Sequence, residues 1–257
     1  MMPIIKKWLY SDKDIFLREI VSNASDAITK YKKLVSLGEA AEDERYQIVV
    51  TTDDKAGTLT VEDNGIGMTE EEVEKYITQI AFSGAADFLE KYEKAGGEGI
   101  IGHFGLGFYS AYMVSDNIEI FTKSYREGSK GVHWQSDGNS TYTIGECDKQ
   151  TRGTKVVMHL AEGEKEFARE SEVRKLLNKY CSFMPYEIFL NPKSEEELNK
   201  DLKEGEEPKM NTPVNTTEPL YLKQPKDCRW SSNAGRSSSI ATRCSLRITS
   251  RKSFPNS

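Results

Sequence analysis

An aspartate followed by two glycines is the first stretch of the sequence whose residue types suit ligand binding. Asp63 ends an alternation of polar and apolar residues that begins at Thr58, and Asn64, Gly65 and Gly67 follow it. The alternation predicts a half-buried strand that stops at the turn-forming pair Asp-Asn. The glycines allow the backbone to adopt positive φ or to pass close to a ligand. On this stretch alone, an ordinary Asp-Asn-Gly turn is a simpler interpretation than a binding site.

A polar stripe along a predicted helix offers metal and proton-transfer chemistry. The helical period covers about residues 15–34. Four polar residues spaced i, i+4, i+7 and i+11 stack along one edge of this helix: Glu19, Asn23, Asp26 and Lys30. The carboxamide oxygen of Asn23 suits Mg²⁺, and Glu19, one turn earlier, suits proton abstraction from an attacking water. For an isolated pair, the simpler interpretation is an acid that interacts favourably with the helix dipole.

The same helix must bury one broad arc to hold the stripe at the wall of a cleft. A projection at roughly 100° per residue gathers the apolar residues on that arc: Phe16, Leu17, Ile20, Val21, Ala24, Ala27 and Ile28. It places four other residues on the solvent face: Arg18, Ser22, Ser25 and Thr29. We therefore expect the stripe at the boundary between core and solvent.

A glycine-rich connection at residues 96–107 suits phosphate binding. It ends in the pattern Gly102-x-x-Gly105-x-Gly107 and leads into an apolar helix predicted at 108–114. Glycines free backbone N–H groups, and a helix N-terminus adds positive potential. The pattern matches neither the dinucleotide fingerprint nor the P-loop, so a flexible loop or lid is the alternative. Farther along, Arg152-Gly153-Thr154 adds a hydroxyl at the start of a predicted strand.

Composition limits the classes of function and the compartment. The net charge is −6, and residues 229–257 hold five Arg, one Lys and no acid, so the rest carries −12, the difference between −6 and +6. An acidic body has no basic face for nucleic acid. The sequence shows no transmembrane span and no secretory signal, and its four scattered cysteines predict neither a zinc site nor disulfides. We expect a cytoplasmic protein with reduced thiols.

The remaining elements are predicted from periodicity and turn residues. Strands are expected at 46–51, 58–62, 117–122, 132–136, 140–144, 154–160 and 187–190, and further helices at 69–80, 87–94 and 166–181. The first two strands form a hairpin, and the four strands between 117 and 160 form one antiparallel meander. His103, His133 and His159 lack metal-binding spacing and are expected to be loop or sheet residues.

Composition also predicts the domain organisation. Residues 1–192 form the expected N-terminal domain, and the charged residues 193–212 form a solvated linker because they offer little to bury. Residues 213–228 begin a second unit. Residues 229–257 are rich in Ser and Arg and have no periodicity, so we expect an aberrant, frame-shifted or genuine Ser/Arg-rich tail without ordered structure.

Four motifs together resemble the ATP-binding domain of the ninety-kilodalton heat-shock chaperones, in the bacterial form. They are residues 15–27 (IFLREIVSNASDA), 63–69 (DNGIGMT), 102–112 (GHFGLGFYSAY) and 152–154 (RGT). The resemblance covers about residues 4–227, and it extends more distantly to type II topoisomerases, mismatch-repair proteins and sensor histidine kinases. It implies a two-layer α/β sandwich of the Bergerat type, in which helices cover one face of a mostly antiparallel sheet and wall the nucleotide cleft.

The resemblance also implies roles for individual residues. Glu19 would orient and deprotonate water, Asn23 would hold Mg²⁺, and Asp63 would accept a hydrogen bond from the adenine amine. Further contacts to the nucleotide are implied for Asp26, Ala27, Lys30, Gly67, Met68, Phe104, Gly105, Leu106, Gly107, Phe108 and Thr154. Of these, Gly67 and Thr154 would act through water, residues 104–107 would meet the phosphates, and Met68 and Phe108 would line the pocket.

Departures from the family pattern bear on turnover. Tyr76 and Phe82 stand where many relatives have Asn and Lys. From the resemblance we expect the family's first strand to be largely missing before Pro3, and the middle domain, with its phosphate-site arginine, to be cut off. We expect the dimerising C-terminal domain to be absent as well, and a homodimer only for the full-length protein.

The expected function is ATP or ADP binding with Mg²⁺ and slow hydrolysis, within a chaperone that assists unfolded client proteins under stress. The alternatives are a histidine kinase or DNA-maintenance ATPase of the same fold, or a nucleotide-binding module without turnover. A kinase would need a phosphoacceptor His upstream, and none precedes His103.

Overall fold

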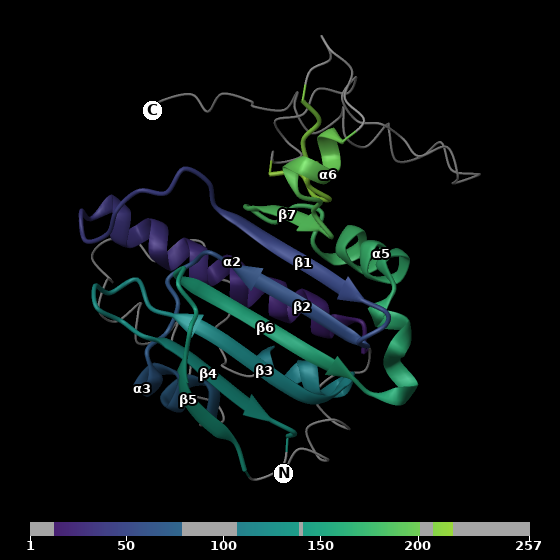
Figure 1. Ribbon diagram of the computed structural model, residues 1–257, viewed down its shortest axis with the longest axis horizontal. Helices are drawn as coiled ribbons and strands as arrows, with labels where there is room; N and C mark the ends of the chain where they lie inside the picture. The colour runs from purple at the N-terminus through teal and green to yellow at the C-terminus, as the bar shows by residue number, and fades with distance from the viewer. Residues whose placement is uncertain (1–12, 79–106, 139–140, 201–207, 218–257) are drawn as a thin grey trace, which may run out of the picture. The chain divides into compact units, whose positions relative to one another are not determined.

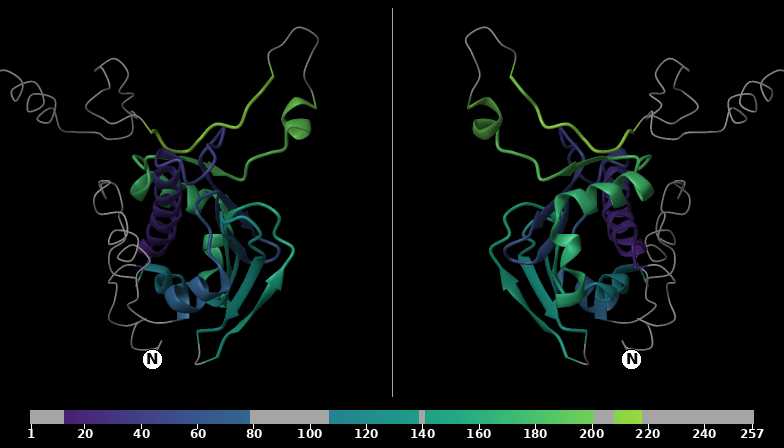
Figure 2. Two further views of the ribbon diagram at one scale, coloured as in Figure 1. Left: turned by 90° about the vertical axis from the view of Figure 1, so that its left-hand side faces the viewer. Right: turned by 90° about the vertical axis from the view of Figure 1, so that its right-hand side faces the viewer.

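The structure, a computed structural model, describes residues 13–78, 107–138, 141–200 and 208–217. The chain divides into two units, Met1–Glu218 and Pro219–Ser257, and all described residues belong to the first. In that unit a sheet forms one layer and helices form the other (Figures 1 and 2). This arrangement confirms the predicted α/β sandwich, whereas the predicted domain boundaries stay predictions.

The sheet has seven strands in the described part of the chain. They are β1 (Gln47–Asp53), β2 (Thr58–Asp63), β3 (Ser115–Lys123), β4 (Gly131–Ser136), β5 (Thr143–Cys147), β6 (Gly153–Leu160) and β7 (Glu187–Leu190). Their order across the sheet is β5-β4-β3-β6-β2-β1-β7. Neighbouring strands are antiparallel except β1 and β7, which are parallel. All the strands expected from alternation are present.

The predicted meander is wrong at its last strand. β3, β4 and β5 follow one another in space, but β6 returns to pair with β3 and β2 instead of β5. The side chains explain this order. β6 carries Val156, Val157 and Met158, which suit the middle of a sheet, whereas β5 exposes Thr143 and Glu146, which suit an edge. Alternation predicts that a strand exists but not which strand it pairs with.

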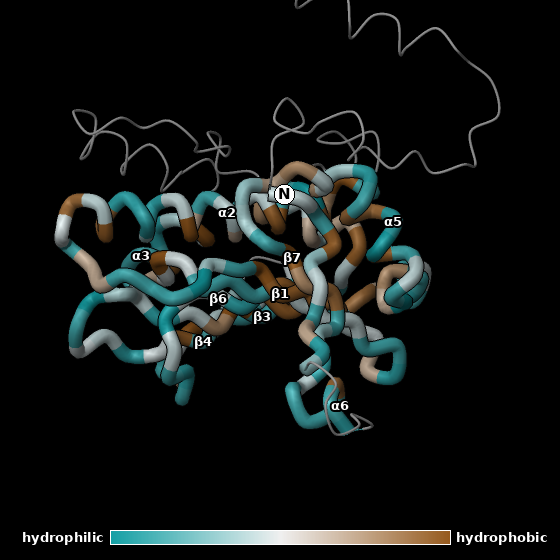
Figure 3. Tube along the Cα trace, turned by 90° about the horizontal axis from the view of Figure 1, so that it is seen from above, coloured by the Kyte–Doolittle hydropathy of each residue, from teal (hydrophilic) through white to brown (hydrophobic). Residues whose placement is uncertain are grey.

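The long helix α2 (Ile15–Ser36) packs against the sheet and carries the polar stripe. Its fully buried residues include Phe16 and Ile28, which meet strand residues such as Val61 and Ile118 in one core. Figure 3 shows α2 and α5 (Glu170–Tyr180) in one layer and the strands in the next. The helix ends where Gly38 adopts φ +75° and the N–H of Glu39 donates to the carbonyl of Leu34, which is a Schellman ending.

The predicted solvent face of α2 is wrong at two serines. Ser22 is 6% exposed and Ser25 is fully buried, because α2 packs against α5 as well as against the sheet. The hydroxyl of Thr29, on the same face, contacts the hydroxyl of Tyr186 at 3.0 Å. Small side chains here allow α5 to approach α2 closely. A projection alone does not show that a helix has two partners.

The shorter helices differ from expectation mainly in type. Helix α3 (Glu70–Val73) begins with the capping box of Thr69 and continues as a π-helical turn, Glu74–Thr78. Gly107–Met113 is a 3-10 helix, and Glu162–Ala168 is a 3-10 helix that precedes α5. A short helix, α6 (Glu195–Asn199), lies within the predicted linker. The helix predicted at 87–94 lies outside the described residues.

The sequence predicted reduced cysteines and no transmembrane span. Cys147 and Cys181 are free thiols, and burial raises the pKa of Cys181 to about 12. Cys228 and Cys244 lie outside the described residues, as does the predicted tail at 229–257. In the part of the chain that the structure describes, no helix is long and apolar enough to cross a membrane.

Candidate nucleotide-binding site

Asp63 ends β2 as a buried carboxylate with defined donors. Its side chain accepts a hydrogen bond from the N–H of Gly65 at 2.8 Å, and it pairs in the sheet with Thr154, whose backbone amide also donates to it. Asp63 is 7% exposed. Burial raises the pKa of Asp63 to about 7, although the two amides and the positive charge of Lys149 act in the opposite direction.

The turn after Asp63 is fastened to α2. The N–H of Ile66 donates to the carbonyl of Ala27 at 3.0 Å. A Cβ at Gly65 would lie 2.5 Å from the carbonyl carbon of Ala27, so only glycine permits this approach. Gly67 has φ +63°, and a Cβ there would overlap the backbone of Lys123. The two glycines therefore bring the turn against both the helix and the end of β3.

Two threonines line the strand ends beside this turn. The hydroxyl of Thr154 lies 2.9 Å from that of Thr122, and the N–H of Met68 donates to Thr122 at 3.0 Å. Thr122 is fully buried. Sequence reasoning singled out Thr154 and Met68 but missed Thr122, because the facing of Thr122 and Thr154 follows only from the pairing of β3 with β6.

The last glycine of the glycine-rich loop meets the polar stripe of α2. A Cβ at Gly107 would lie 2.9 Å from Oε2 of Glu19 and 3.6 Å from Oδ1 of Asn23. The hydroxyl of Ser110 donates to the carbonyl of Gly107 at 2.6 Å and closes the 3-10 turn. The loop thus ends directly beside the residues predicted for water and metal. Phe104, Gly105 and Leu106 lie outside the described residues.

Glu19 is held by its neighbour on the helix. Arg18 donates to Oε1 of Glu19 from Nη2 at 2.6 Å and from Nε at 3.1 Å. Both bonds use the same oxygen, which leaves Oε2 facing Gly107. The carboxylate therefore has one oxygen directed at the loop where phosphates are predicted.

The residues present fit Mg²⁺ that is shared with a phosphate. No group of three or more His, Cys, Asp or Glu side chains in the described ranges could hold a metal ion. Asn23 is exposed and offers one hard oxygen near Gly107. Mg²⁺ commonly takes one or two protein oxygens and completes its shell with phosphates and water. The carboxamide oxygen of Asn23, beside the glycine-rich loop where phosphates are predicted to bind, is compatible with that preference.

Residues 12–168 match a family model described as histidine kinase-, DNA gyrase B- and HSP90-like ATPase. The chain belongs to this ATPase family. It is 48% identical over 230 residues to the chaperone protein HtpG of Porphyromonas gingivalis, covering 89% of this chain and 33% of that protein. It is 39% identical over 230 residues to the mitochondrial heat shock protein 75 kDa of Bos taurus, covering 88% of this chain and 30% of that protein.

The relatives are longer than this chain. The chaperone protein htpG of Bacteroides fragilis is 48% identical over 227 residues, a match that covers 88% of this chain and 32% of that protein. The chain thus spans about a third of the length of these curated relatives. These comparisons confirm the resemblance drawn from the four motifs, and they concern the ATPase domain.

The remaining predicted site residues of this ATPase domain lie near its core. Asp26 is 4% exposed and Lys30 is half-buried on α2. Met68 is half-buried against the core. Phe108 is 8% exposed, and its ring packs edge-to-face against Trp134 at 5.8 Å. Their contacts with nucleotide stay predictions, as do the roles of Glu19, Asn23 and Asp63.

The histidines form a separate cluster on the sheet. His133 on β4 and His159 on β6 contact the two carboxylate oxygens of Glu119 on β3, at 2.8 and 2.6 Å. Burial opposes ionisation of Glu119, but these hydrogen bonds outweigh it and lower the pKa of its carboxyl. Both histidines are sheet residues, as expected, and His103 lies outside the described residues.

Proposed function

We propose that this chain is the ATP-binding, slowly hydrolysing N-terminal module of a molecular chaperone and that it takes ATP or ADP with Mg²⁺. One observation carries the proposal: α2 holds both ends of the site. Glu19 and Asn23 meet Gly107, and Ala27 fastens the Asp63 turn. Eight residues of helix separate Glu19 from Ala27, about 12 Å along the axis. A nucleoside phosphate can bridge that separation.

The role proposed for each residue is the one that the family resemblance implies, and the position of each described residue is compatible with it. The ionised carboxylate of Asp63 accepts a hydrogen bond from the exocyclic amine of adenine, while Met68 and Phe108 supply apolar contact. Gly67 and Thr154 complete the base contacts through water. At the other end, Asn23 holds Mg²⁺, which neutralises phosphate charge when bound. Glu19 orients water and takes its proton.

Further contacts are proposed for neighbouring residues. The backbone of residues 104–107 meets the phosphates. Asp26 and Lys30 contact the nucleotide from the stripe of α2 that carries Glu19 and Asn23, and Ala27 contacts it from the adjoining position one turn after Asn23.

Calorimetry of ADP binding tests the base end of the site. Asp63→Asn should weaken binding by roughly 10- to 100-fold, because a hydrogen bond to a charged group is lost and the amide presents N–H groups to the adenine amine. Asp53→Asn, at the exposed last residue of β1, is the matched control and should bind as the parent does. Tight binding of ADP by Asp63→Asn would contradict the assignment of Asp63 to adenine recognition.

A single-turnover assay tests the phosphate end. Glu19→Ala should bind ATP and lose Mg²⁺-dependent turnover. One observation favours the second candidate, a nucleotide-binding module without turnover: Arg18 already occupies one oxygen of Glu19. If the parent chain binds ATP but its cleavage rate equals that of Glu19→Ala, the second candidate is correct.

We propose chaperone activity, client binding and homodimerisation only for a full-length protein that contains this chain. The support is the name shared by the bacterial relatives, which are chaperone proteins. We also propose a cytoplasmic location and no direct role in nucleic-acid or membrane binding. Nucleotide-dependent suppression of aggregation of an unfolded protein, measured with the full-length protein and its Glu19→Ala variant, tests the chaperone role. Equal suppression by both, with and without ATP, would contradict it.

A further inference from the structure

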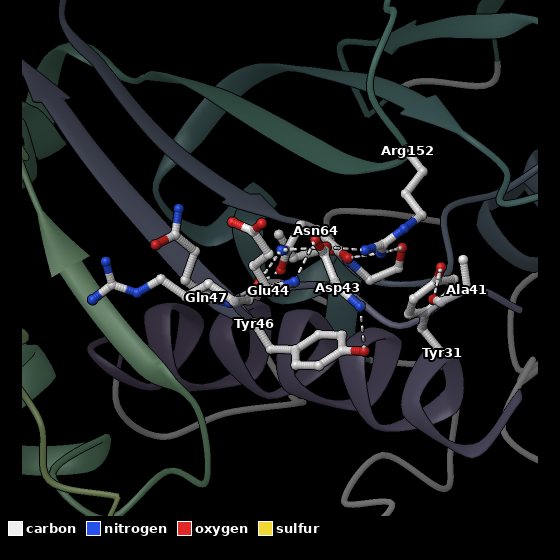
Figure 4. Close-up of polar contacts among 11 residues, drawn as sticks. Tyr31, Ala41, Asp43, Glu44, Tyr46, Gln47, Asn64 and Arg152 are labelled. Atoms are coloured by element: carbon white, nitrogen blue, oxygen red, sulfur yellow. Dashed lines mark hydrogen bonds and ion pairs between the residues drawn. The ribbon is translucent and has the colours of Figure 1, made fainter. Parts of the chain in front are cut away.

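Arg152 reaches across the back of the Asp63 turn and contacts four residues from three segments of the chain (Figure 4). Its Nη1 donates to the carbonyls of Asn64 and Gly65, the latter at 3.0 Å. Its Nη2 pairs with the carboxylate of Asp43. The guanidinium also lies over the ring of Tyr31 at 3.5 Å. Only 17% of the Arg152 side chain is exposed.

The two carbonyls that Arg152 holds belong to peptide units whose N–H groups have their own partners. The peptide unit of Asn64 and Gly65 donates its N–H to Oδ1 of Asp63 at 2.8 Å. The next unit, of Gly65 and Ile66, donates its N–H to the carbonyl of Ala27 at 3.0 Å. A positive charge at a carbonyl polarises the peptide and strengthens the hydrogen bond made by its N–H. Arg152 therefore acts on the donor that faces Asp63.

The surrounding residues fix the guanidinium. Asn64 donates from Nδ2 to Asp43 at 3.2 Å and to the carbonyl of Arg45 at 2.6 Å. The hydroxyl of Tyr31 donates to the carbonyl of Ala41 at 2.7 Å, which holds the ring beneath Arg152. A planar fork of donors stacked on an aromatic ring is a geometry that lysine cannot reproduce.

We propose that Arg152 is a positioning residue for adenine recognition, which fixes the two peptide units after Asp63 and so keeps the N–H of Gly65 directed at the carboxylate. The role rests on the proposed function of Asp63. The proposal adds Arg152, whose guanidinium donates to the carbonyls of the two peptide units. The N–H groups of the same units donate to Asp63 and Ala27. Loss of Arg152 weakens the N–H donor and makes the Asp63 carboxylate easier to protonate.

Other charged groups act on Asp63 independently of Arg152. Lys149 lowers the pKa of Asp63 and Glu62 raises it, and these two side chains form an ion pair at 2.8 Å. The helix side of the turn presents Ala27 and Ile28, neither of which titrates. Replacing Arg152 therefore leaves the charged neighbours of Asp63 in place.

The first test needs no nucleotide. In ¹⁵N-labelled protein, the Gly65 amide resonance reports ionisation of Asp63 because that N–H donates to it. Arg152→Met, which removes the charge and keeps an unbranched stem over Tyr31, should raise the pH midpoint by about one unit. Arg126→Met is the matched control, since Arg126 pairs with Glu72 and lies near the ring of Tyr125. Its midpoint should equal that of the parent.

The second test uses ADP. Calorimetry should show about tenfold weaker binding by Arg152→Met at pH 6 and nearly equal binding at pH 9, where Asp63 is ionised in both proteins. An unchanged Gly65 midpoint, or a loss of affinity that is equal at pH 6 and pH 9, overturns the positioning role.

Failure of the parent to bind ADP and failure of the variant to fold lead to different conclusions. If the parent binds no ADP, the proposed function fails, while the Gly65 titration still decides the role of Arg152. If Arg152→Met does not fold, Arg152→Gln replaces it, because the side-chain amide removes the charge and keeps N–H donors for a carbonyl of the turn. An unchanged midpoint in that variant also overturns the role.

Discussion

Ionisation of Asp63 should destabilise the nucleotide-free fold, so Asp63→Asn should be more favourable for stability at pH 8 than at pH 5. Burial raises the pKa of Asp63 from 3.8 to about 7. Because the folded-state pKa lies above the unfolded value, this group contributes stability that is fully present below pH 3.8. That contribution is lost as the pH rises through about 7.

The magnitude follows from these two pKa values. For one group that titrates at 3.8 when unfolded and at about 7 when folded, the free energy of unfolding falls by about 2.5 kcal/mol between pH 5 and pH 8. Asn cannot ionise, so the variant lacks this loss. The Asn amide oxygen can still accept from Gly65, but Asn has one acceptor oxygen where Asp has two, and this change costs about 1–3 kcal/mol at both pH values. That constant cost cancels when the two pH values are compared.

Urea unfolding of the nucleotide-free parent and Asp63→Asn at pH 5 and pH 8 measures this difference. Asp53→Asn makes the same chemical change at the exposed last residue of β1. It shows how much of the pH-dependent effect arises without burial of the aspartate. A stability difference between parent and Asp63→Asn that is the same at both pH values would refute the link between burial and ionisation.

Two further predictions concern the turn and the strands beside it. Gly67→Ala should destabilise the fold by more than Gly57→Ala, because both positions have positive φ but only Gly67 faces nearby backbone. Strain alone costs about 1–2 kcal/mol, so equal losses in urea unfolding would contradict the close approach. Thr122→Val should cost about 1–3 kcal/mol and weaken ADP binding in calorimetry, since the hydroxyls of Thr122 and Thr154 face each other. Thr51→Val, at an exposed strand position, is its control. If the two variants lose equally little stability, the contact between Thr122 and Thr154 does not stabilise the fold.

Local pattern was sufficient for most elements. The helix expected over about 15–34 extends over Ile15–Ser36, two residues farther, because Gly38 and not the apolar period ends it. The hairpin of β1 and β2 forms as expected, with Val50 opposite Val61. Such elements are predictable because their signals are contained in neighbouring residues: side-chain alternation, helical period and turn-forming glycines.

Burial and strand order were less predictable. Ser22 and Ser25 look like surface residues on a helical wheel, yet both are buried, because α5 comes from a distant part of the chain. Similarly, β6 leaves β5 and inserts between β3 and β2. The burial of these serines and the position of β6 depend on which surfaces pack together. Packing is decided by the summed burial of many residues and not by the preferences of neighbouring residues.

Residue types and spacing were enough to predict the family and the helix that carries Glu19 and Asn23. How the predicted site residues meet depends on the tertiary structure. It places Gly107 against Glu19, Thr122 against Thr154 and Arg152 behind the peptides that follow Asp63. The physical reason is that side-chain periodicity acts over a few residues. Sheet register and close backbone approach join segments that are far apart in the chain, so they exist only once the core has formed.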